Sequence, residues 1–475
     1  MPTNQEDYVS TTVLARSLQM KNTDLFALLD DNGWTIMDGK NRVLTDKGIR
    51  AGGQYKSNDK GEKWVVWDPS IIESQLFKQE ILGNMDQKKR KFKLPGIDDL
   101  NKDQDRVLRL PEDGRFLIVG GPGTGKSVVA LLRAMKYHEK NDYKFLTYNK
   151  VLLSSTKQLV DFRLESLTLD SYLGKLYWAK FQKNLPKIEN KHSSEDNFLP
   201  IDYVKIISDL QSTEYQTKAT HIIIDEAQDK PPEYFDSLMS FGFENFFIVA
   251  DQNQQITETN SSRQQLADIM GLNKEQVIEL NENYRNSYPI ALFSSTFYTD
   301  PASPPPKFPP ESRSSLGVPM LIQYNNPQEV IHVILREYDR DDRNLIGVIV
   351  ANDTLRNFYV THLENSEIRR DNPKPIISSY SSMDTRQPNI NFAYSGIVVL
   401  NDKSIKGLEF DIVFIIIDGF SINNNDLDSM KKRFYVMSSR AIKKLVLFKS
   451  NDYRGIDTIL TTDENILKIE RINRG

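Results

Sequence analysis

The stretch Arg115-Phe-Leu-Ile-Val-Gly-Gly-Pro-Gly-Thr-Gly-Lys-Ser127 decides the fold of this chain. Its second part, from Gly120 to Ser127, has the pattern G-x-x-x-x-G-K-S of a phosphate-binding loop. The apolar run at 115–119 is typical of a buried parallel strand, and residues 127–136 contain good helix formers without a breaker. A strand, a glycine-rich turn and a helix together place backbone N–H groups and a helix N-terminus against phosphate oxygens.

Individual positions of this loop have distinct expected roles. Lys126 would reach the β- and γ-phosphates of ATP, and the Ser127 hydroxyl would hold Mg²⁺. Gly123 and Gly125 allow the backbone to turn where a Cβ atom would clash. The predicted phosphate-binding set is Gly120, Gly121, Pro122, Gly123, Thr124, Gly125, Lys126 and Ser127.

A second nucleotide-binding signal follows about a hundred residues later, in Ile222-Ile-Ile-Asp-Glu-Ala-Gln-Asp229. An apolar strand here delivers two carboxylates at its carboxyl end, which is where open α/β sheets bind their ligands. We expect Asp225 to hold the Mg²⁺ shell and Glu226 to polarise the attacking water. The two signals together predict an enzyme that hydrolyses ATP with Mg²⁺.

The composition is ordinary for a globular protein and restricts the function. The chain has 475 residues, of which 39% are hydrophobic and 27% charged, and this length suits about three domains. No apolar run approaches the roughly 18–20 residues of a membrane span, and the first residues lack the features of a signal peptide. The absence of cysteine excludes disulfides and thiolate chemistry, and it fits a cytoplasmic location without a membrane partner. With a net charge of −4, any nucleic acid must bind a local basic groove.

The alternation of apolar runs and helical patterns predicts an α/β fold with two domains built on parallel sheets. Residues 99–282 would form the first domain, with a helical insertion at about 175–217, and residues 283–475 the second. Besides 115–119, strands are expected at 145–148, 222–224, 246–250, 320–324, 345–350, 397–400, 412–417 and 445–448. The proline-rich run 301–310 suits neither a helix nor a central strand, so it predicts a stiff surface connection.

Residues 1–70 are expected to form a small separate α+β unit. Two helix-start signals, at 10–12 and 22–24, precede apolar segments, and strand-like pieces follow at 42–45 and 64–67. This order suggests a winged helix, and the run from Leu14 to Gly53 resembles the C-terminal domain of some phage antirepressors. The unit has nine Lys/Arg and ten Asp/Glu, so DNA binding and protein docking both stay open. Residues 71–98 would be a linker, and its basic run at 88–93 is expected to be solvated.

Five further short motifs follow the linker. They are Leu100-Asn-Lys-Asp-Gln104, Ala250-Asp-Gln-Asn-Gln254, Asn283-Tyr-Arg-Asn286, Ser404-Ile-Lys-Gly-Leu-Glu-Phe410 and Phe434-Tyr-Val-Met-Ser-Ser-Arg440. Each alone suits an ordinary core or surface role, but in this order and near these spacings they support one another. Together they resemble the UvrD/Rep-type superfamily-1 helicases. The resemblance implies two RecA-like motor domains and 3′-to-5′ movement on single-stranded or tailed duplex DNA.

The resemblance also implies roles for single residues. Those expected at the base and ribose of the nucleotide are Gln104, Tyr284 and Glu409. Those expected at the γ-phosphate are Gln254 as a sensor, Gly407 through its backbone, and Arg285 and Arg440 as arginine fingers. Those expected on nucleic acid are Tyr148, Asn149, Thr168 and Lys403. The expected catalytic set is Lys126, Glu226, Gln254, Arg285 and Arg440.

Three features depart from the family. Asn401 and Lys403 stand where the family usually has Thr and His, which leaves the detail of the DNA contact open. Only about 120 residues separate Arg285 from Gly407, which is too few for the family's large second insertion. The N-terminal unit lies outside the family core.

The expected function is an ATP-dependent DNA helicase or translocase. The two arginines would draw the domains together over the γ-phosphate, and hydrolysis would let them reopen. A second hypothesis is a DNA-gated ATPase that regulates a partner, such as a nuclease in a repair or phage-defence complex. The small N-terminal unit and the missing insertion favour this second hypothesis. A transcription factor with an ATPase sensor is a third, and RNA in place of DNA stays open.

Overall fold

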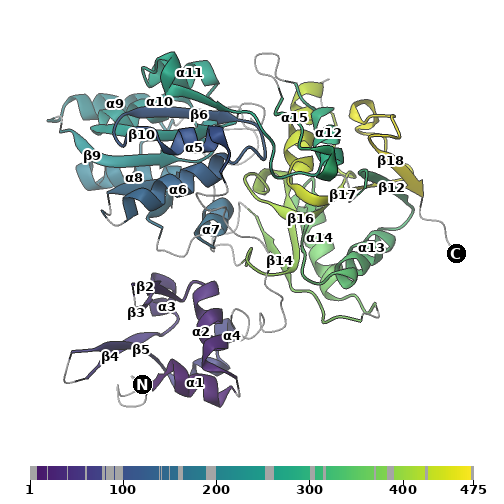
Figure 1. Ribbon diagram of the computed structural model, residues 1–475, viewed down its shortest axis with the longest axis horizontal. Coiled ribbons are helices and arrows are strands. Elements are labelled where there is room, and N and C mark those ends of the chain that lie inside the picture. The colour runs from purple at the N-terminus through teal and green to yellow at the C-terminus, as the bar shows by residue number, and fades with distance from the viewer. Residues whose placement is uncertain are drawn as a thin grey trace.

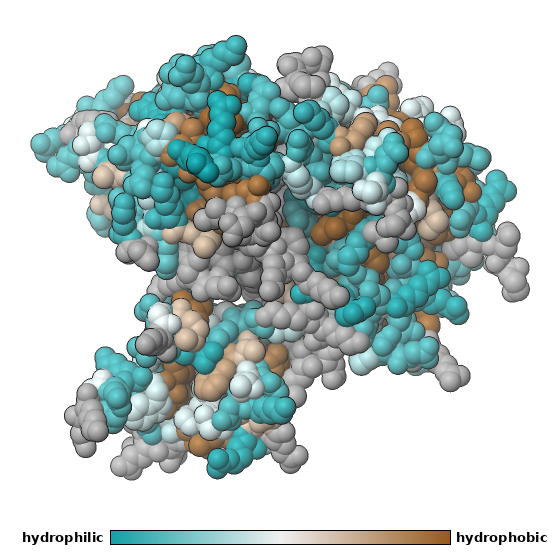
Figure 2. All heavy atoms as spheres, viewed as in Figure 1, coloured by the Kyte–Doolittle hydropathy of each residue, from teal (hydrophilic) through white to brown (hydrophobic). Residues whose placement is uncertain are grey.

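The computed structural model of the chain describes residues 8–18, 20–39, 41–58, 61–77, 81, 90, 100–138, 140, 142–148, 150–158, 164–188, 199–214, 216–251, 261–299, 305–313, 317–368, 371–381, 390–422 and 426–471. These residues form a small N-terminal unit and two domains, each built on its own parallel sheet (Figure 1). The expected fold class, with two RecA-like α/β domains and a small α+β unit, is confirmed. Hydrophilic side chains cover most of the face shown in Figure 2. Of the helices within these ranges, none is both long enough and apolar enough to cross a bilayer.

The N-terminal unit packs helices against antiparallel strands (Figure 1). Its strands are β1 (Val9–Ser10), β2 (Thr35–Asp38), β3 (Asn41–Leu44), β4 (Gln54–Ser57) and β5 (Lys63–Trp67), joined as a β1-β5-β4 sheet and a β2-β3 hairpin. Its helices are α1 (Thr11–Ser17), α2 (Asn22–Asp31), α3 (Asp46–Arg50) and α4 (Gln75–Phe77). The Trp34 ring lies 5.7 Å from the Trp67 ring and 5.9 Å from the Phe77 ring. The core of the unit therefore continues past residue 70.

The first α/β domain has a six-stranded parallel sheet in the order β11-β6-β10-β9-β7-β8. Its strands are β6 (Arg115–Gly120), β7 (Tyr143–Thr147), β8 (Ser166–Thr168), β9 (Lys218–Ile224), β10 (Phe243–Ala250) and β11 (Val277–Leu280). Its helices are α5 (Lys102–Leu108), α6 (Lys126–His138), α7 (Lys150–Gln158), α8 (Leu169–Phe181), α9 (Tyr203–Gln211), α10 (Pro232–Ser240) and α11 (Arg263–Ile269). Within the expected insertion, Tyr177, Ile206 and Leu210 are buried in the core that covers this sheet.

The second α/β domain has a seven-stranded parallel sheet in the order β14-β15-β13-β16-β17-β12-β18. Its strands are β12 (Met320–Tyr324), β13 (Leu345–Val350), β14 (Ile377–Tyr380), β15 (Gly396–Asn401), β16 (Phe410–Ile416), β17 (Ala441–Ser450) and β18 (Lys468–Arg471). Its helices are α12 (Tyr288–Ser295), α13 (Pro327–Arg340), α14 (Asp353–Glu364) and α15 (Leu427–Ser438). The interior strand β13 is buried along its whole length, as its continuous apolar sequence predicts.

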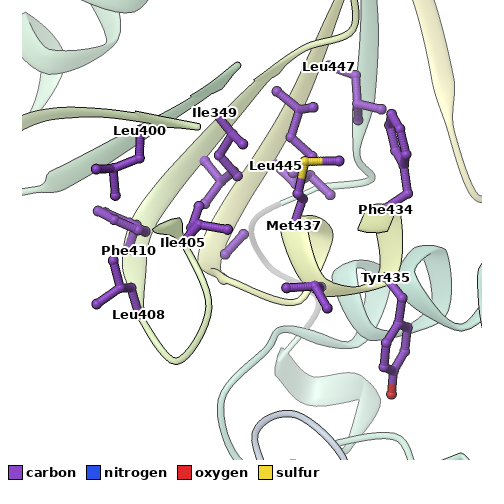
Figure 3. Packing of buried hydrophobic residues seen from close by; sticks show 14 of the residues in the cluster. Ile349, Leu400, Ile405, Leu408, Phe410, Phe434, Tyr435, Met437, Leu445 and Leu447 are labelled. Atoms are coloured by element: carbon purple, nitrogen blue, oxygen red, sulfur yellow. The ribbon is translucent and has the colours of Figure 1, made fainter. Parts of the chain in front are cut away.

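The connection between β15 and β16 brings the second domain against the first. Because β13 lies between these two strands, residues 402–409 must cross the sheet from the end of β15 to the start of β16. We call residues 402–409 the crossover. Leu408 of the crossover and Phe410 at the start of β16 point into the core of the second domain (Figure 3). A Cβ atom at Gly407 would lie 2.6 Å from Cδ1 of Leu152 in α7, so the crossover packs closely against the first domain.

Arg90 departs from the expectation that the basic run of the linker is solvated. Its side chain is only 5% exposed. Its backbone N–H donates to the Ala393 carbonyl at 2.9 Å, and its Nε donates to Asp411 Oδ2 at 2.9 Å. A guanidinium group tolerates burial where its charge is paired and its N–H groups are bonded, and a run of basic residues in a sequence does not reveal such a partner.

Candidate active site

The phosphate loop lies between β6 and α6. Gly123 and Gly125 have φ angles of 76° and 85°, which L side chains rarely adopt. A Cβ atom at Gly123 would lie 2.3 Å from Asn283 Oδ1, and one at Gly121 would lie 2.1 Å from Pro306 Cγ. Glycine is therefore required both by the backbone of the loop and by the close approach of the chain beyond β11.

Lys126 begins α6, and its ammonium group folds back over the loop. Nζ donates to the Gly120 carbonyl at 2.6 Å and to the Gly121 carbonyl at 2.8 Å. It also lies 3.2 Å from Asp251 Oδ2, in an ion pair that is almost wholly buried. Burial raises the pKa of the Asp251 carboxyl, and Lys126 offsets part of that rise. The loop thus fixes a positive charge beside its own backbone, as a phosphate-binding site requires.

Asp225 follows β9 at the same edge of the sheet. Burial, followed by repulsion from Glu226, raises the pKa of its carboxyl to about 7, while the Ser127 hydroxyl and Lys126 act in the opposite direction. Among the described residues, the buried Asp225 Oδ2 has no hydrogen-bond partner. Mg²⁺ takes hard oxygen ligands, usually with one or two carboxylates. A buried carboxylate oxygen beside a serine hydroxyl therefore fits the metal predicted for these two residues.

Glu226 has an unusual backbone and a fixed side chain. Its φ angle of 59° is one of two positive values among the non-glycine residues that the structure describes, and such a conformation costs about 1–3 kcal/mol. The Gln228 amide holds the carboxylate, because Nε2 donates to Glu226 Oε2 at 2.6 Å and Oε1 accepts from the Asp251 N–H at 2.9 Å. Burial raises the pKa of Glu226, but Lys406 and Lys126 outweigh burial and hold the pKa below its usual value. Glu226 is therefore an oriented, ionised carboxylate.

Lys406 is a site residue that the sequence analysis missed. It belongs to the crossover of the second domain and is only 2% exposed. Its Nζ lies 2.5 Å from Asp229 Oδ1 and 4.0 Å from Glu226 Oε2, both in the first domain. Burial raises the pKa of the Asp229 carboxyl to about 6, although Lys406 acts against this rise. The sequence did contain a signal, since Lys406 directly precedes Gly407 and Asp229 closes the acidic run after β9.

Arg285 and Arg440 approach each other from two parts of the second domain. Arg285 Nε donates to Glu409 Oε1 at 2.7 Å, so two residues expected at the nucleotide are paired here with each other. Within the described ranges, the buried Arg285 Nη1 has no hydrogen-bond partner. Arg440 is 1% exposed, and burial together with Arg285 lowers its pKa to about 10. A buried and a partly buried guanidinium group so placed favour an anion between them.

Tyr284 and Gln104 lie beside the loop. The Tyr284 side chain is 39% exposed, its N–H donates to the Gly123 carbonyl at 2.8 Å, and its hydroxyl accepts from Asn101 Nδ2 at 2.5 Å. The buried Gln104 amide is bonded at both ends, since Oε1 accepts from the Asn101 N–H at 3.1 Å and Nε2 donates to the Thr124 carbonyl at 3.0 Å. The structure therefore shows Gln104 supporting the loop, and its contact with adenine stays a prediction.

Three of the residues expected on nucleic acid, Tyr148, Thr168 and Lys403, lie at the carboxyl ends of strands. Because β7 and β8 are paired neighbours, Tyr148 and Thr168 follow one another along the carboxyl edge of the first sheet. Tyr148 is half-buried, which raises the pKa of its hydroxyl. Lys403 is exposed at the carboxyl end of β15, on the second sheet. Asn149 and the sensor Gln254 lie outside the described residues.

Part of this chain is similar to a helicase domain. A family model described as the Schlafen group 3 DNA/RNA helicase domain matches residues 114–294. A search of curated proteins finds no match. Among solved structures, the C-terminal domain of a possible DNA helicase from Lactobacillus plantarum WCFS1 is 15% identical, over 39% of this chain and 98% of that chain, with a TM-score of 0.27. S. cerevisiae Dbp5 bound to RNA and ADP BeF3 is 14% identical, over 78% of this chain and 89% of that chain, with a TM-score of 0.43.

The family match supports the part of the resemblance that concerns helicases in general. Residues 114–294 are similar to a helicase domain, and they include the phosphate loop, the acidic run after β9 and Arg285. The assignment to the UvrD/Rep type is finer than this match and stays a prediction.

Proposed function

We propose that this chain is an ATP-dependent helicase or translocase of the UvrD/Rep type that acts on single-stranded or tailed duplex DNA. The observation that carries the proposal is the charged cluster shared by the two α/β domains. Lys126 and Glu226 come from the first domain, and Lys406 and Arg440 from the second. A site divided in this way is complete only while the domains are together, so ATP turnover can be coupled to their relative motion.

The first domain would bind ATP and activate water. Lys126 and the loop N–H groups would bind the β- and γ-phosphates, and Tyr284 would stack on the adenine. Ser127 and Asp225 would hold Mg²⁺, which neutralises charge on the phosphates. Glu226, held by Gln228, would accept a hydrogen bond from the attacking water and orient it.

The second domain would supply the arginine fingers. Arg285 would turn from Glu409 toward the γ-phosphate, and Arg440, also from the second domain, would approach the same phosphate. In related phosphoryl transfers an arginine finger is worth about 10³–10⁵ in rate. Loss of the γ-phosphate would remove the charge that holds both arginines, and the domains would reopen. Alternating grips of the two domains on one strand would then move the protein, in the 3′-to-5′ direction that the resemblance implies.

The test is ATP hydrolysis and strand displacement by the whole chain on 3′-tailed, 5′-tailed and blunt DNA duplexes. We expect single-stranded DNA to stimulate hydrolysis and only the 3′-tailed duplex to be separated, with Lys126→Ala as the inactive control. Hydrolysis that no nucleic acid stimulates would refute the proposal. Matched RNA substrates form a further arm, because the matching family is described as DNA/RNA helicases, and stimulation by RNA alone would change the substrate class.

The docked N-terminal unit favours a second function, a DNA-gated ATPase that regulates a partner such as a nuclease in a repair or phage-defence complex. Arg90 ties the linker to the second domain, and Asp31 of the unit bonds the Tyr394 hydroxyl. A unit held against the motor in this way could report the binding of a partner. Strand displacement separates the two functions, because a regulator would hydrolyse ATP on DNA but separate strands poorly.

A further inference from the structure

The N-terminal unit and the linker bind the second domain at one place. Asn391 Nδ2 lies 3.3 Å from Asn32 Oδ1, and the Tyr394 hydroxyl bonds Asp31 at the end of α2. Between these contacts, Arg90 donates from its backbone to the Ala393 carbonyl at 2.9 Å and from Nη1 to the Phe392 carbonyl at 3.0 Å. We call residues 390–394 the docking segment. It lies just before β15, the strand that leads into the crossover.

Asp411 is the anchor of this contact. Its Oδ2 accepts from Arg90 Nε at 2.9 Å and from the Leu345 N–H at 3.0 Å, and its Oδ1 lies 2.8 Å from Lys443 Nζ. Burial raises the pKa of the Asp411 carboxyl, but Arg90 and Lys443 outweigh burial and bring the pKa below its usual value. Charge-assisted hydrogen bonds of this kind are stronger than neutral ones, so the start of β16 is firmly fixed.

The start of β16 also sets the position of Glu409, which lies two residues before Asp411. Phe410, between them, packs against Phe392 of the docking segment with ring centroids 6.4 Å apart. On its other side the Phe410 ring would lie 2.8 Å from a Cβ atom at Gly347, which leaves it little room to move. Glu409 itself is bonded to Arg285. A short, tightly packed path therefore joins Arg90 to the nucleotide site.

We propose that Arg90 is a positioning residue of the nucleotide site, which acts through Asp411 and Phe410 on Glu409, and that the docked N-terminal unit acts on nucleotide binding by this path. The inference rests on the proposed function, because it uses the expected contact of Glu409 with the ribose. The motor motifs assign no role to the N-terminal unit. By this inference, docking of the unit raises the affinity of the site for nucleotide.

The test compares ATP turnover of the whole chain carrying Arg90→Ala with that of the unchanged chain. A ribose contact is present in both the ground state and the transition state, so its loss raises KM and leaves kcat nearly unchanged. We expect KM for ATP to rise about tenfold, which corresponds to about 1.4 kcal/mol, or one charge-assisted hydrogen bond. Lys443→Ala is the matched control, since it removes a cation from the same carboxylate without touching the docking segment. It should change KM by less than about twofold.

Two further readouts separate positioning from general destabilisation. Because Arg90 acts through Glu409, the KM effects of Arg90→Ala and Glu409→Ala should not add in the double variant. Both variants should also lose any preference for ATP over 3′-deoxy-ATP, whereas a merely destabilised protein would keep that preference. Should Arg90→Ala fail to fold, Asp411→Asn breaks the same link with an amide of equal size, and the same rise in KM is expected.

Docking itself can be measured without ATP, because the chain has no cysteine. In Asn32→Cys/Asn391→Cys, a short bis-maleimide should join the two positions, and adding Arg90→Ala should reduce the yield severalfold. If the chain without substitutions binds no nucleotide, the proposed function is refuted. Docking of the N-terminal unit can then still be measured by this cross-link. Normal ATP binding by the unchanged chain, with an unaltered KM in both Arg90→Ala and Asp411→Asn, would overturn the inference.

Discussion

Replacing Lys406 by methionine tests the charged cluster between the domains. Methionine keeps most of the apolar length and removes the ammonium that lies 2.5 Å from Asp229 and 4.0 Å from Glu226. Unit charges about 4 Å apart attract by about 4 kcal/mol at an effective dielectric constant of about 20. Removing one partner of a buried ion pair typically costs about 3–5 kcal/mol. Because Asp229 can take up a proton once Lys406 is gone, we expect the lower end of that range, about 3 kcal/mol.

This loss should fall on the association of the domains, because Lys406 and Asp229 belong to different domains. Calorimetry should therefore show a larger difference between the unfolding temperatures of the two α/β domains, because the chain has more than one cooperative unit. Single-turnover hydrolysis at saturating ATP and DNA should fall about a hundredfold, the equivalent of about 3 kcal/mol in closing the cleft.

The control is Lys205→Met, which removes the cation of an exposed Lys205–Asp209 pair on α9. Such surface pairs contribute about 0–1 kcal/mol, so neither the calorimetric profile nor turnover should change measurably. In the double variant Lys406→Met/Asp229→Leu, stability should recover, because apolar pairs can replace buried ion pairs, while turnover should stay low. A Lys406→Met chain with unaltered turnover and unfolding would refute the reasoning.

Four other outcomes are expected. Lys126→Ala should abolish ATP turnover and leave the circular dichroism spectrum unchanged; normal turnover would remove the lysine from the site. Glu226→Gln should bind ATP and DNA but hydrolyse slowly, and loss of ATP binding in a filter assay would make the residue structural. Arg285→Ala and Arg440→Ala should each slow single-turnover hydrolysis by about 10³ or more without additivity, and near-normal rates would exclude that arginine. The Asp411 carboxyl has a lowered pKa, so it should keep the N-terminal unit docked down to about pH 4 and release it as the pH falls through that pKa, which protease protection would detect.

Local signals in the sequence predicted nine of the thirteen strands of the two parallel sheets and missed the short strands β8, β11, β14 and β18. The strands at 320–324 and 345–350 were predicted to the residue. The second of them is buried on both faces, and such a parallel strand has a continuous apolar sequence. The phosphate loop and the acidic pair after β9 were also predicted, because the residues that act together in each of them are neighbours in the chain.

Contacts between distant segments could not be predicted in this way. Arg90 and Asp411 are 321 positions apart, and Lys406 and Asp229 are 177 positions apart. A lysine or arginine has the same local pattern whether it is solvated or paired in the interior, since its partner is chosen by the packing of the sheets. The pairing of Arg285 with Glu409 was missed for the same reason, because each was assigned separately to the nucleotide.

The crossover has a mechanical consequence. Parallel strands are usually joined by a connection of a dozen or more residues, most often a helix. Here residues 402–409 must span the length of the six-residue strand β15, about 20 Å, and their fully extended reach is only about 30 Å before the short helical turn at 402–404 shortens it. Lys403 at one end and Glu409 at the other are thus joined by a short tether with little slack. In the proposed function, tension on a DNA strand held by Lys403 would pass along this tether to the nucleotide at Glu409. Two glycines inserted after Lys403 would give this tether slack, and hydrolysis would then continue without movement along DNA.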